Sequence, residues 1–398
     1  MRMAKKLMLL GTYAAVLLLV VSTSYFLSPA EEPAEDTDIV GTWNLISREA
    51  IGSHGYDRTV DQKFSLEVTE KYGNIFTATS QGVAFTGVRV GDNVVFEYRY
   101  GNTAWITADG RISSDGILTT YETHYYTEDY WFISVSKYSK TDEPPNTAHI
   151  TPKQGQSSWT LREGNSHNYD GMAKSYPLKG ANLLIRMPEG NLFKAEMQQQ
   201  VNDADGNAVV TTRLMSGAFV DDTDDVITAF LIDESGKIWV LTIQNGLATL
   251  RTIVISEYYS PEKTLVVTER AYFNGIKPSV PTPPNMKGTW TANGAAGRWS
   301  DGSNASQSGT IETIYREQTG YVFIGETPAA SLPEVGYLVY SPHAYNGWIV
   351  HVGTDLGGGD YKTGCAFLNG NEMIMVEFTW DDVKKVNGVM VYEFKKIA

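Results

Sequence analysis

Gly41-Thr42-Trp43 opens a segment of sequence that returns twice further along the chain. A close copy stands at Gly288-Thr289-Trp290 and a weaker one at Ser157-Ser158-Trp159. At nearly the same distance behind each Trp comes a second shared motif, in the forms Gly73-Asn74-Ile75-Phe76, Gly190-Asn191-Leu192-Phe193 and Gly320-Tyr321-Val322-Phe323. Self-similarity at a fixed spacing is the signature of a repeated structural unit. The sequence therefore predicts three copies of one unit.

Each copy divides into eight short runs with strand character, separated by turn residues. The predicted strands of the first copy are 41–48, 64–72, 75–81, 84–90, 93–100, 103–108, 117–125 and 129–138. Those of the second are 158–163, 182–187, 192–200, 213–220, 226–232, 238–244, 247–258 and 264–273, and those of the third are 288–292, 310–317, 321–326, 336–341, 348–353, 361–368, 372–380 and 389–397. Gly91-Asp92, Asp109-Gly110 and Asp115-Gly116 are predicted turns of the first copy.

The composition favours an all-β fold. Of the 398 residues 42% are hydrophobic, and the 23 Tyr, 9 Trp and 37 Gly suit strands joined by tight turns. Eight sequential antiparallel strands can close into a barrel, which removes both sheet edges. We therefore expect three tandem antiparallel eight-stranded barrels, with β-sandwiches as the alternative. The predicted barrels are 39–140, 157–276 and 286–398, separated by Pro-rich spacers that place the domain boundaries.

The three units resemble the calycin superfamily of lipocalin-like and avidin-like barrels. The resemblance rests on the Gly-Thr-Trp opening, the eight runs, and a basic residue on each last run. In lipocalins the first-strand Trp packs across the barrel floor beneath a basic side chain, which is a cation–π contact. The resemblance thus implies three barrel-floor pairs, namely Trp43 with Lys137, Trp159 with Arg270, and Trp290 with Lys395.

The N-terminal region predicts export. Residues 1–6 carry three basic residues, and 7–27 form a stretch without formal charge that is long enough to span a bilayer. An acidic stalk, 28–38, follows. The positive-inside rule then gives a single-pass membrane protein with a cytoplasmic N-terminus, its repeats outside, and the lipid bilayer as partner of 7–27. A cleaved signal peptide, which would make the protein secreted, is the alternative.

Charge and residue type exclude several classes of function. The net charge of −14 argues against nucleic acid as a partner. The six His residues form no metal-binding motif and no cofactor fingerprint is present, so we expect no metal and no cofactor. Cys365 is the single cysteine, which excludes an intrachain disulfide, and its apolar run indicates an inert buried thiol. The acidic segments 221–225 and 202–206 lack calcium-loop spacing and read as solvated turns. Asn304 begins one glycosylation sequon.

Two features remain as candidates for function. Glu122 and His124 share one face of a strand and could form an acid–base pair, although a polar pair on an exposed sheet face is the simpler interpretation. Tyr121, Tyr125 and Trp131 are aromatic residues close to the end of the first unit, and they could line a ligand site. The sequence thus favours a non-enzymatic binding protein for a small apolar ligand or a protein partner. A spacer or assembly scaffold with filled barrels, and a secreted hydrolase, are the alternatives.

Overall fold

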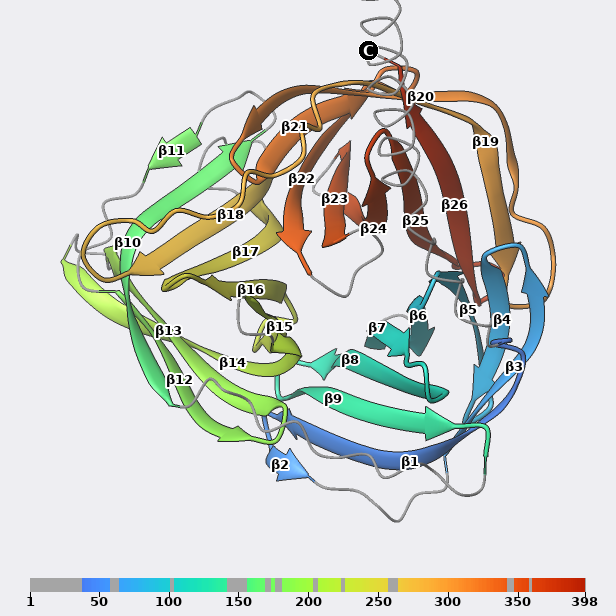
Figure 1. Cartoon of the computed structure of the whole chain (residues 1–398), viewed down its shortest axis with the longest axis horizontal. Coiled ribbons are helices and arrows are strands. Elements are labelled where there is room, and N and C mark those ends of the chain that lie inside the picture. The colour runs from blue at the N-terminus through green and yellow to red at the C-terminus, as the bar shows by residue number, and fades with distance from the viewer. Residues whose placement is uncertain are drawn as a thin grey trace, which may run out of the picture. The chain divides into compact units, whose positions relative to one another are not determined.

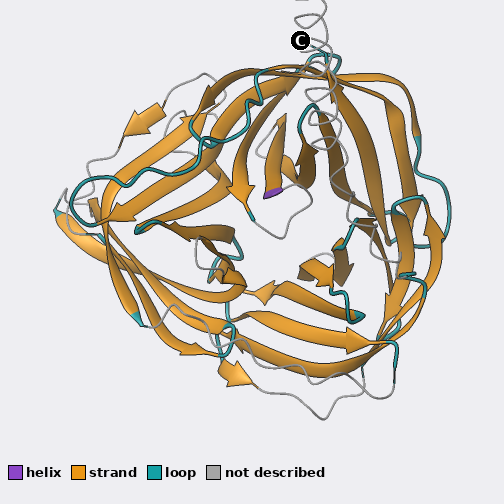
Figure 2. Cartoon of the chain, viewed as in Figure 1, coloured by secondary structure: helices purple, strands orange, loops and turns teal. Residues whose placement is uncertain are grey.

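The computed structural model is built almost entirely of strands (Figure 2). It describes residues 38–57, 64–100, 104–141, 156–168, 173–175, 181–202, 207–222, 226–256, 264–341, 347–357 and 360–397. The predicted membrane segment 7–27 lies outside these residues, as do most of the stalk and most of the first spacer. Within the described residues no helix has the length and apolar character needed to cross a membrane.

Three closed antiparallel barrels follow one another along the chain (Figure 1). The first consists of β1 (Gly41–Gly52), β3 (Ser65–Tyr72), β4 (Ile75–Ser80), β5 (Val83–Val90), β6 (Asn93–Tyr100), β7 (Ala104–Ile112), β8 (Ile117–Thr127) and β9 (Tyr130–Ser139). Consecutive strands pair as hairpins, and β1 closes the barrel by pairing with β9. A short ninth strand, β2 (Gly55–Asp57), extends the sheet beside the end of β1.

The second and third barrels repeat this order. The second is built from β10 (Ser157–Asn168), β12 (Asn182–Glu189), β13 (Leu192–Asn202), β14 (Ala208–Asp222), β15 (Val226–Asp233), β16 (Ile238–Gln244), β17 (Leu247–Ser256) and β18 (Thr264–Phe273), with β11 (Ala173–Ser175) as its short extra strand. The third comprises β19 (Gly288–Trp299), β20 (Gln307–Thr319), β21 (Val322–Thr327), β22 (Leu332–Tyr340), β23 (Trp348–Gly357), β24 (Asp360–Asn369), β25 (Glu372–Asp381) and β26 (Val386–Lys396).

The first strand of each unit closes its barrel by changing partners along its length. The N-terminal part of β1 pairs with β3, and the remainder pairs with β9 after a register shift between Leu45 and Ser47. β10 shows the same shift between Leu161 and Glu163, and β19 shows one between Thr291 and Ala295. A bulge bends a strand and increases its twist, which lets one strand complete a curved sheet at both of its ends. The barrel prediction is confirmed, and the sandwich alternative is wrong.

The second repeated motif places a phenylalanine ring over a glycine on the next strand. Phe76 lies directly across from Gly87, Phe193 from Gly217 and Phe323 from Gly336. A Cβ added at these glycines would lie 2.2, 2.4 and 2.2 Å from the ring, so no other residue fits without movement. All three rings are fully buried. The glycine is therefore part of the repeat's core, because the aromatic ring occupies the space of the missing side chain.

One predicted turn and several strand ends need correction. Asp109-Gly110 is not a turn, because β7 continues through both residues to Ile112 and the chain reverses at 113–116. Asp-Gly is a strong turn signal, but here the pair remains inside a ladder of hydrogen bonds with β6 and β8. The predicted strand 288–292 is likewise too short, since β19 runs on through a glycine-containing segment.

In two of the three units the first-strand tryptophan lies beneath a lysine, but these lysines differ from the predicted ones. Lys140 lies 5.1 Å from the Trp43 ring, and Lys396 lies 5.7 Å from the Trp290 ring. Lys137 and Lys395 occupy alternate strand positions, so they face outward, and Lys395 pairs with Glu372 at 3.1 Å. In the second barrel Arg270 lies over Trp239 at 6.0 Å, whereas Trp159 is half-buried and donates to Ser157 Oγ.

Apolar side chains of different barrels pack together in common buried clusters. One buried cluster combines Ile133 of the first barrel, Val267 of the second and Val335 of the third, and another joins the first and third. Hydrogen bonds cross each boundary. Tyr121 donates to the carbonyl of Val220, Thr228 to that of Tyr340, and Asn387 to that of Ala84.

Candidate functional site

The largest cavity among the described residues that we identify lies where the outer faces of all three barrels meet. Its volume is about 500 Å³, within the range of sites for small molecules. The first barrel contributes residues of β6, β7 and β8, the second residues of β15, the β15–β16 turn, β16 and β17, and the third residues of β22, β23, β24 and β25. Most lining side chains of the first barrel alternate along their strands with those that fill its core, so the cavity lies on the outer face of that barrel.

Aromatic rings form much of the cavity wall. Trp105 and Tyr121 come from the first barrel, Phe230 from the second, and Tyr337 from the third. His351 stacks on Tyr337 with ring centroids 5.0 Å apart, and Phe230 meets the edge of the same imidazole. Large aromatic surfaces beside a few polar groups are typical of ligand pockets.

Carboxyl groups from two neighbouring strands face the cavity. Burial raises the pKa of the Asp109 carboxyl to about 7, and burial also raises the pKa of Glu97 against the opposing charge of Arg99. Glu97 accepts a hydrogen bond from Thr107 at 3.4 Å. No hydrogen bond or ion pair connects Asp109 to another residue in the described part of the chain. Asp109 is therefore half protonated near neutral pH and available to a ligand.

The basic groups of the cavity are mostly compensated by the protein itself. Lys362 forms an ion pair with Glu377 at 2.6 Å, and Arg99 lies 3.9 Å from Glu97. Burial lowers the pKa of Lys237, which lies in the turn after β15. Burial also lowers the pKa of His351 to about 4, and its Nε2 is buried with no hydrogen-bond partner among the described residues. The imidazole is thus neutral at physiological pH.

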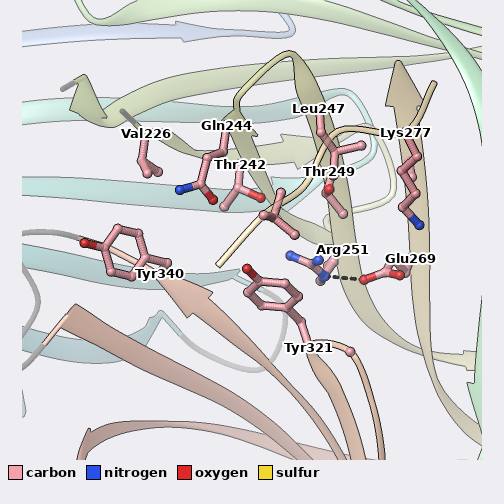
Figure 3. A pocket seen from close by; sticks show the side chains of 13 residues that line it. Val226, Thr242, Gln244, Leu247, Thr249, Arg251, Glu269, Lys277, Tyr321 and Tyr340 are labelled. Atoms are coloured by element: carbon pink, nitrogen blue, oxygen red, sulfur yellow. Dashed lines mark hydrogen bonds and ion pairs between the residues drawn. The ribbon is translucent and has the colours of Figure 1, made fainter. Parts of the chain in front are cut away.

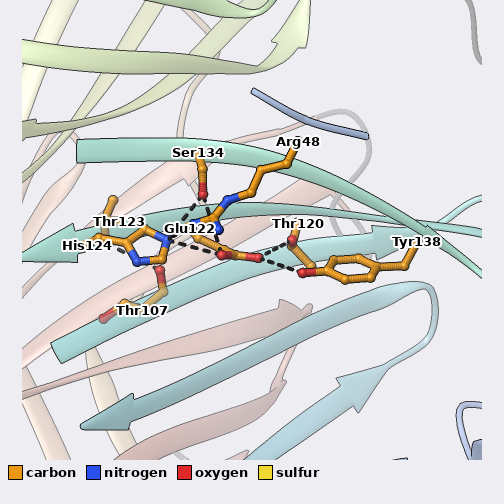
Figure 4. A network of polar contacts seen from close by, with 8 residues as sticks. All are labelled: Arg48, Thr107, Thr120, Glu122, Thr123, His124, Ser134 and Tyr138. Atoms are coloured by element: carbon orange, nitrogen blue, oxygen red, sulfur yellow. Dashed lines mark hydrogen bonds and ion pairs between the residues drawn. The ribbon is translucent and has the colours of Figure 1, made fainter. Parts of the chain in front are cut away.

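A second group of polar residues lies inside the first barrel (Figure 4). Glu122 and His124 are both buried, with 3.1 Å between carboxylate and Nε2, so the prediction of an exposed polar pair is wrong. Their strand positions alternate with Tyr121 and Thr123, which face outward. Thr120 donates to Glu122 at 2.7 Å. Burial alone would raise the pKa of Glu122, but His124, Arg48 and Thr120 together lower it to about 2.

This internal network does not have the geometry of a hydrolytic relay. Ser134 Oγ lies 3.1 Å from His124 Nε2, the same nitrogen that contacts Glu122. The Arg48 guanidinium also contacts this nitrogen at 3.5 Å, whereas Nδ1 has no hydrogen-bond partner among the described residues. A Ser–His–acid relay needs the serine and the acid on opposite ring nitrogens. The arrangement can hold a compensated charge inside the barrel, but it does not activate Ser134.

The three aromatic residues singled out from the sequence all face outward, at the boundary between the first and second barrels. Tyr121 lines the cavity and donates to the Val220 carbonyl at 3.3 Å. Tyr125 stacks on Trp105 and covers Gly236, where an added Cβ would meet its ring at 2.7 Å. Trp131 is buried beneath Lys194, whose ammonium lies 5.5 Å from the ring. Only Tyr121 is therefore placed to touch a ligand in the cavity, and its ligand-binding role stays a prediction.

Other candidates from the sequence take no part in this site, with one exception. Cys365 lines the cavity, and burial together with the nearby Asp109 and Glu97 raises the pKa of its thiol, which keeps it unreactive. Across the described ranges, no group of His, Cys, Asp and Glu is arranged to hold a metal ion. His149, His343 and most of the acidic segments 202–206 and 221–225 lie outside the residues that the structure describes.

Sequence reasoning missed the residues that the second and third barrels supply, including Phe230, Tyr337 and His351. Each belongs to an ordinary strand of its own unit. Only the tertiary arrangement brings them together with Asp109, so the one available signal was the aromatic character of their outward positions.

No known protein family and no curated protein matches the sequence. Solved structures with a related arrangement include a candidate outer membrane protein from Bacteroides fragilis NCTC 9343, at 9% identity and a TM-score of 0.22, covering 60% of this chain and 99% of that one. Another is a mutant of the vaccine antigen transferrin binding protein B from Haemophilus parasuis, at 7% identity and a TM-score of 0.18, covering 90% of this chain and 76% of that one. At these TM-scores neither likeness carries an argument about function.

Proposed function

We propose that the protein is a non-enzymatic, extracytoplasmic binding protein that holds a small amphipathic ligand between its three barrels. The observation that carries the proposal is the cavity of about 500 Å³ with aromatic walls and the Asp109 carboxyl, which no hydrogen bond or ion pair joins to another described residue. A ligand with an apolar body would pack on Tyr121, Phe230 and Tyr337, and a hydrogen-bond donor on it would satisfy Asp109. This differs from the sequence-based hypothesis in the place of binding, which is between barrels and not within one.

Residues 7–27 support membrane attachment, because the stretch has no formal charge and is flanked by basic residues before it and acidic residues after it. We assign the barrels to the outside of that membrane. We also assign them to a calycin-like class, since Trp43 and Trp290 each lie beneath a lysine at the barrel floor. Recovery of the full chain in carbonate-washed membranes is expected, and a soluble product with a processed N-terminus would contradict the anchor.

The binding proposal can be tested with N-phenyl-1-naphthylamine, an apolar aromatic amine whose fluorescence rises on burial. We expect saturable binding of one probe per chain. Thr107→Trp fills the cavity and should weaken this binding at least tenfold, whereas Thr42→Trp adds the same bulk to an exposed position and should leave it unchanged. Circular dichroism of both variants verifies that the strands remain.

A rigid spacer is the second candidate, and it is favoured by the tight packing inside the barrels. Trp43, Trp290, Tyr272 and Tyr315 are among the largest side chains and are fully buried. An eight-stranded barrel interior can be filled by side chains alone. If the folded protein shows no saturable binding of the probe, or if Thr107→Trp binds the probe as tightly as the unmodified protein does, the spacer function replaces the binding function.

A further inference from the structure

A second, smaller cavity lies on the outer face of the second barrel, where the β20–β21 turn and the end of β22 of the third barrel cover it (Figure 3). Its volume is about 160 Å³, and strands β15 to β18 form its base. Tyr321 and Tyr340 close the opposite side. It shares no lining residue with the larger cavity between the three barrels, which we call the central cavity. It is therefore a separate site, independent of the proposed function above.

Arg251 is the charged group at the base of this pocket, and it is held rigidly. Only 5% of the residue is exposed. Its Nε donates to Glu269 at 2.6 Å, and its guanidinium lies 4.7 Å from the centre of the Tyr321 ring. The other guanidinium nitrogens lie on the side away from Glu269 (Figure 3), and no hydrogen bond joins them to another described residue. Arginine thus presents a fixed fork of donors to the pocket.

Three further side chains present polar groups without a protein partner. Thr242, Gln244 and Tyr340 line the pocket, and within the described residues no hydrogen bond uses their side-chain atoms. Hydroxyl and amide groups both donate and accept hydrogen bonds. A ligand that both donates and accepts at several positions would satisfy this set, whereas a carboxylate, which only accepts, would leave the amide oxygen unused.

The charges of the pocket are balanced by the protein itself. Burial alone would raise the pKa of Glu269, but the charge and hydrogen bond of Arg251 outweigh burial and lower it, so Glu269 stays ionised beside the guanidinium. Lys277, also on the lining, is ion-paired with Glu163. Neither a cation nor an anion would find an unpaired opposite charge here. The electrostatics favour an uncharged ligand.

Aromatic rings complete the site. Tyr340 meets the indole of Trp348 edge-on at 5.2 Å, and Tyr321 lies 5.9 Å from the same indole. Both tyrosines are half-buried, so part of each ring remains open to the pocket. Ring faces offer apolar contact to the C–H groups of a ligand whose hydroxyls point elsewhere.

We propose that this pocket binds a neutral, hydroxyl-rich ring of monosaccharide size, with Arg251 and Gln244 bonding its hydroxyls and Tyr340 contacting its apolar face. The pocket has the volume, the balanced charges, the mixed donors and acceptors and the aromatic walls that suit this class of ligand. A drug-sized apolar molecule would exceed the volume.

The test uses the full chain and a panel of named probes, with Trp348 fluorescence and calorimetry as readouts. The neutral probes are methyl glucopyranoside, methyl galactopyranoside, methyl mannopyranoside and N-acetylglucosamine, and the anionic probes are inorganic phosphate and acetate. We expect at least one neutral probe to bind saturably. Gln244→Ala and Arg251→Lys should each weaken that binding at least fivefold. Gln307→Ala, at an exposed position, and Asp109→Asn, in the central cavity, should leave it unchanged.

Each outcome decides the proposal. Saturable binding of phosphate or acetate, without binding of any sugar, would overturn the proposal in favour of an anion site. If no probe binds saturably, the proposal is wrong. Sugar binding that persists in Gln244→Ala would mean that the sugar sits elsewhere. If Arg251→Lys does not fold, Gln244→Ala decides alone, because within the described residues no hydrogen bond joins its half-buried side chain to a partner whose loss would destabilise the protein.

Discussion

Two carboxyl groups, Glu122 inside the first barrel and Asp109 between the barrels, have opposite surroundings. Inside, Trp43 and Trp290 are fully buried, and even the charged Glu122 is compensated by neighbours that donate to it. Between the barrels, Asp109 and His351 face a cavity with polar atoms that no described residue satisfies. The carboxyl inside the first barrel is thus compensated by its neighbours, whereas the carboxyl that faces the cavity between barrels is not. A repeat that fills its own core can offer a site only through its outer faces.

The largest effect that tests this contrast is expected inside. Trp290→Ala should lower the free energy of unfolding by about 3–5 kcal/mol, because a fully buried indole leaves a cavity that the barrel floor cannot close. Trp43→Ala should have a similar cost. Chemical denaturation followed by circular dichroism measures both.

Trp159→Ala is the matched comparison, since this residue holds the same place in the second barrel but is only half-buried. Its cost should be clearly smaller. Equal losses for Trp159→Ala and Trp290→Ala would contradict the expectation that the difference in burial sets the cost.

The next effect is expected between the barrels, and it has the opposite sign. Asp109→Asn should stabilise the protein at pH 8 by at most about 4 kcal/mol, and by less to the extent that the half-buried carboxyl keeps some water. The folded pKa of about 7 lies above the unfolded value of 3.8, so the unmodified protein loses stability as the pH rises from about 4 to 7. Glu97, Cys365 and Tyr337 are the titratable groups around Asp109.

Thermal unfolding of Asp109→Asn and the unmodified protein across pH 4 to 8 provides the measurement. The two curves should coincide near pH 4 and separate above it. A variant that is less stable at pH 8 would mean that Asp109 is compensated in the folded state, and the cavity would then lose its unpaired carboxyl.

The sequence predicted the strands well because their signals are local. Alternation from Val94 to Tyr100 and glycines such as Gly73 at the turns depend only on near neighbours. The errors arose where a local signal competed with the sheet. Asp109-Gly110 has turn chemistry but lies between two strands that supply hydrogen bonds on both sides. The long first strands were cut short because their bulges interrupt the alternation.

The candidate site was largely beyond prediction for a different reason. Asp109, Phe230 and Tyr337 meet only because three separately closed barrels pack with particular outer faces together. No periodicity within one unit encodes that arrangement. The sequence did identify Tyr121, but the expectation concerned a barrel interior, and one step along the strand separates the inward Glu122 from the outward Tyr121.

The smallest expected effect concerns Lys395 and Lys396, two neighbouring residues of β26 that point to opposite faces of the sheet. Lys396→Ala should cost about 1–2 kcal/mol, because Lys396 lies over Trp290 and donates to the Asn285 carbonyl at 2.8 Å. Lys395→Ala should cost less than about 1 kcal/mol, since its ion pair with Glu372 is exposed to solvent. Lys396→Met keeps the length of the side chain but removes the charge, so its share of the loss isolates the cation–π contact and the hydrogen bond from packing. Measured by denaturant unfolding, the order should be Lys396→Ala, Lys396→Met, Lys395→Ala. A larger loss for Lys395→Ala would return the floor contact to the residue that the sequence suggested, and would shift β26 by one residue against β19.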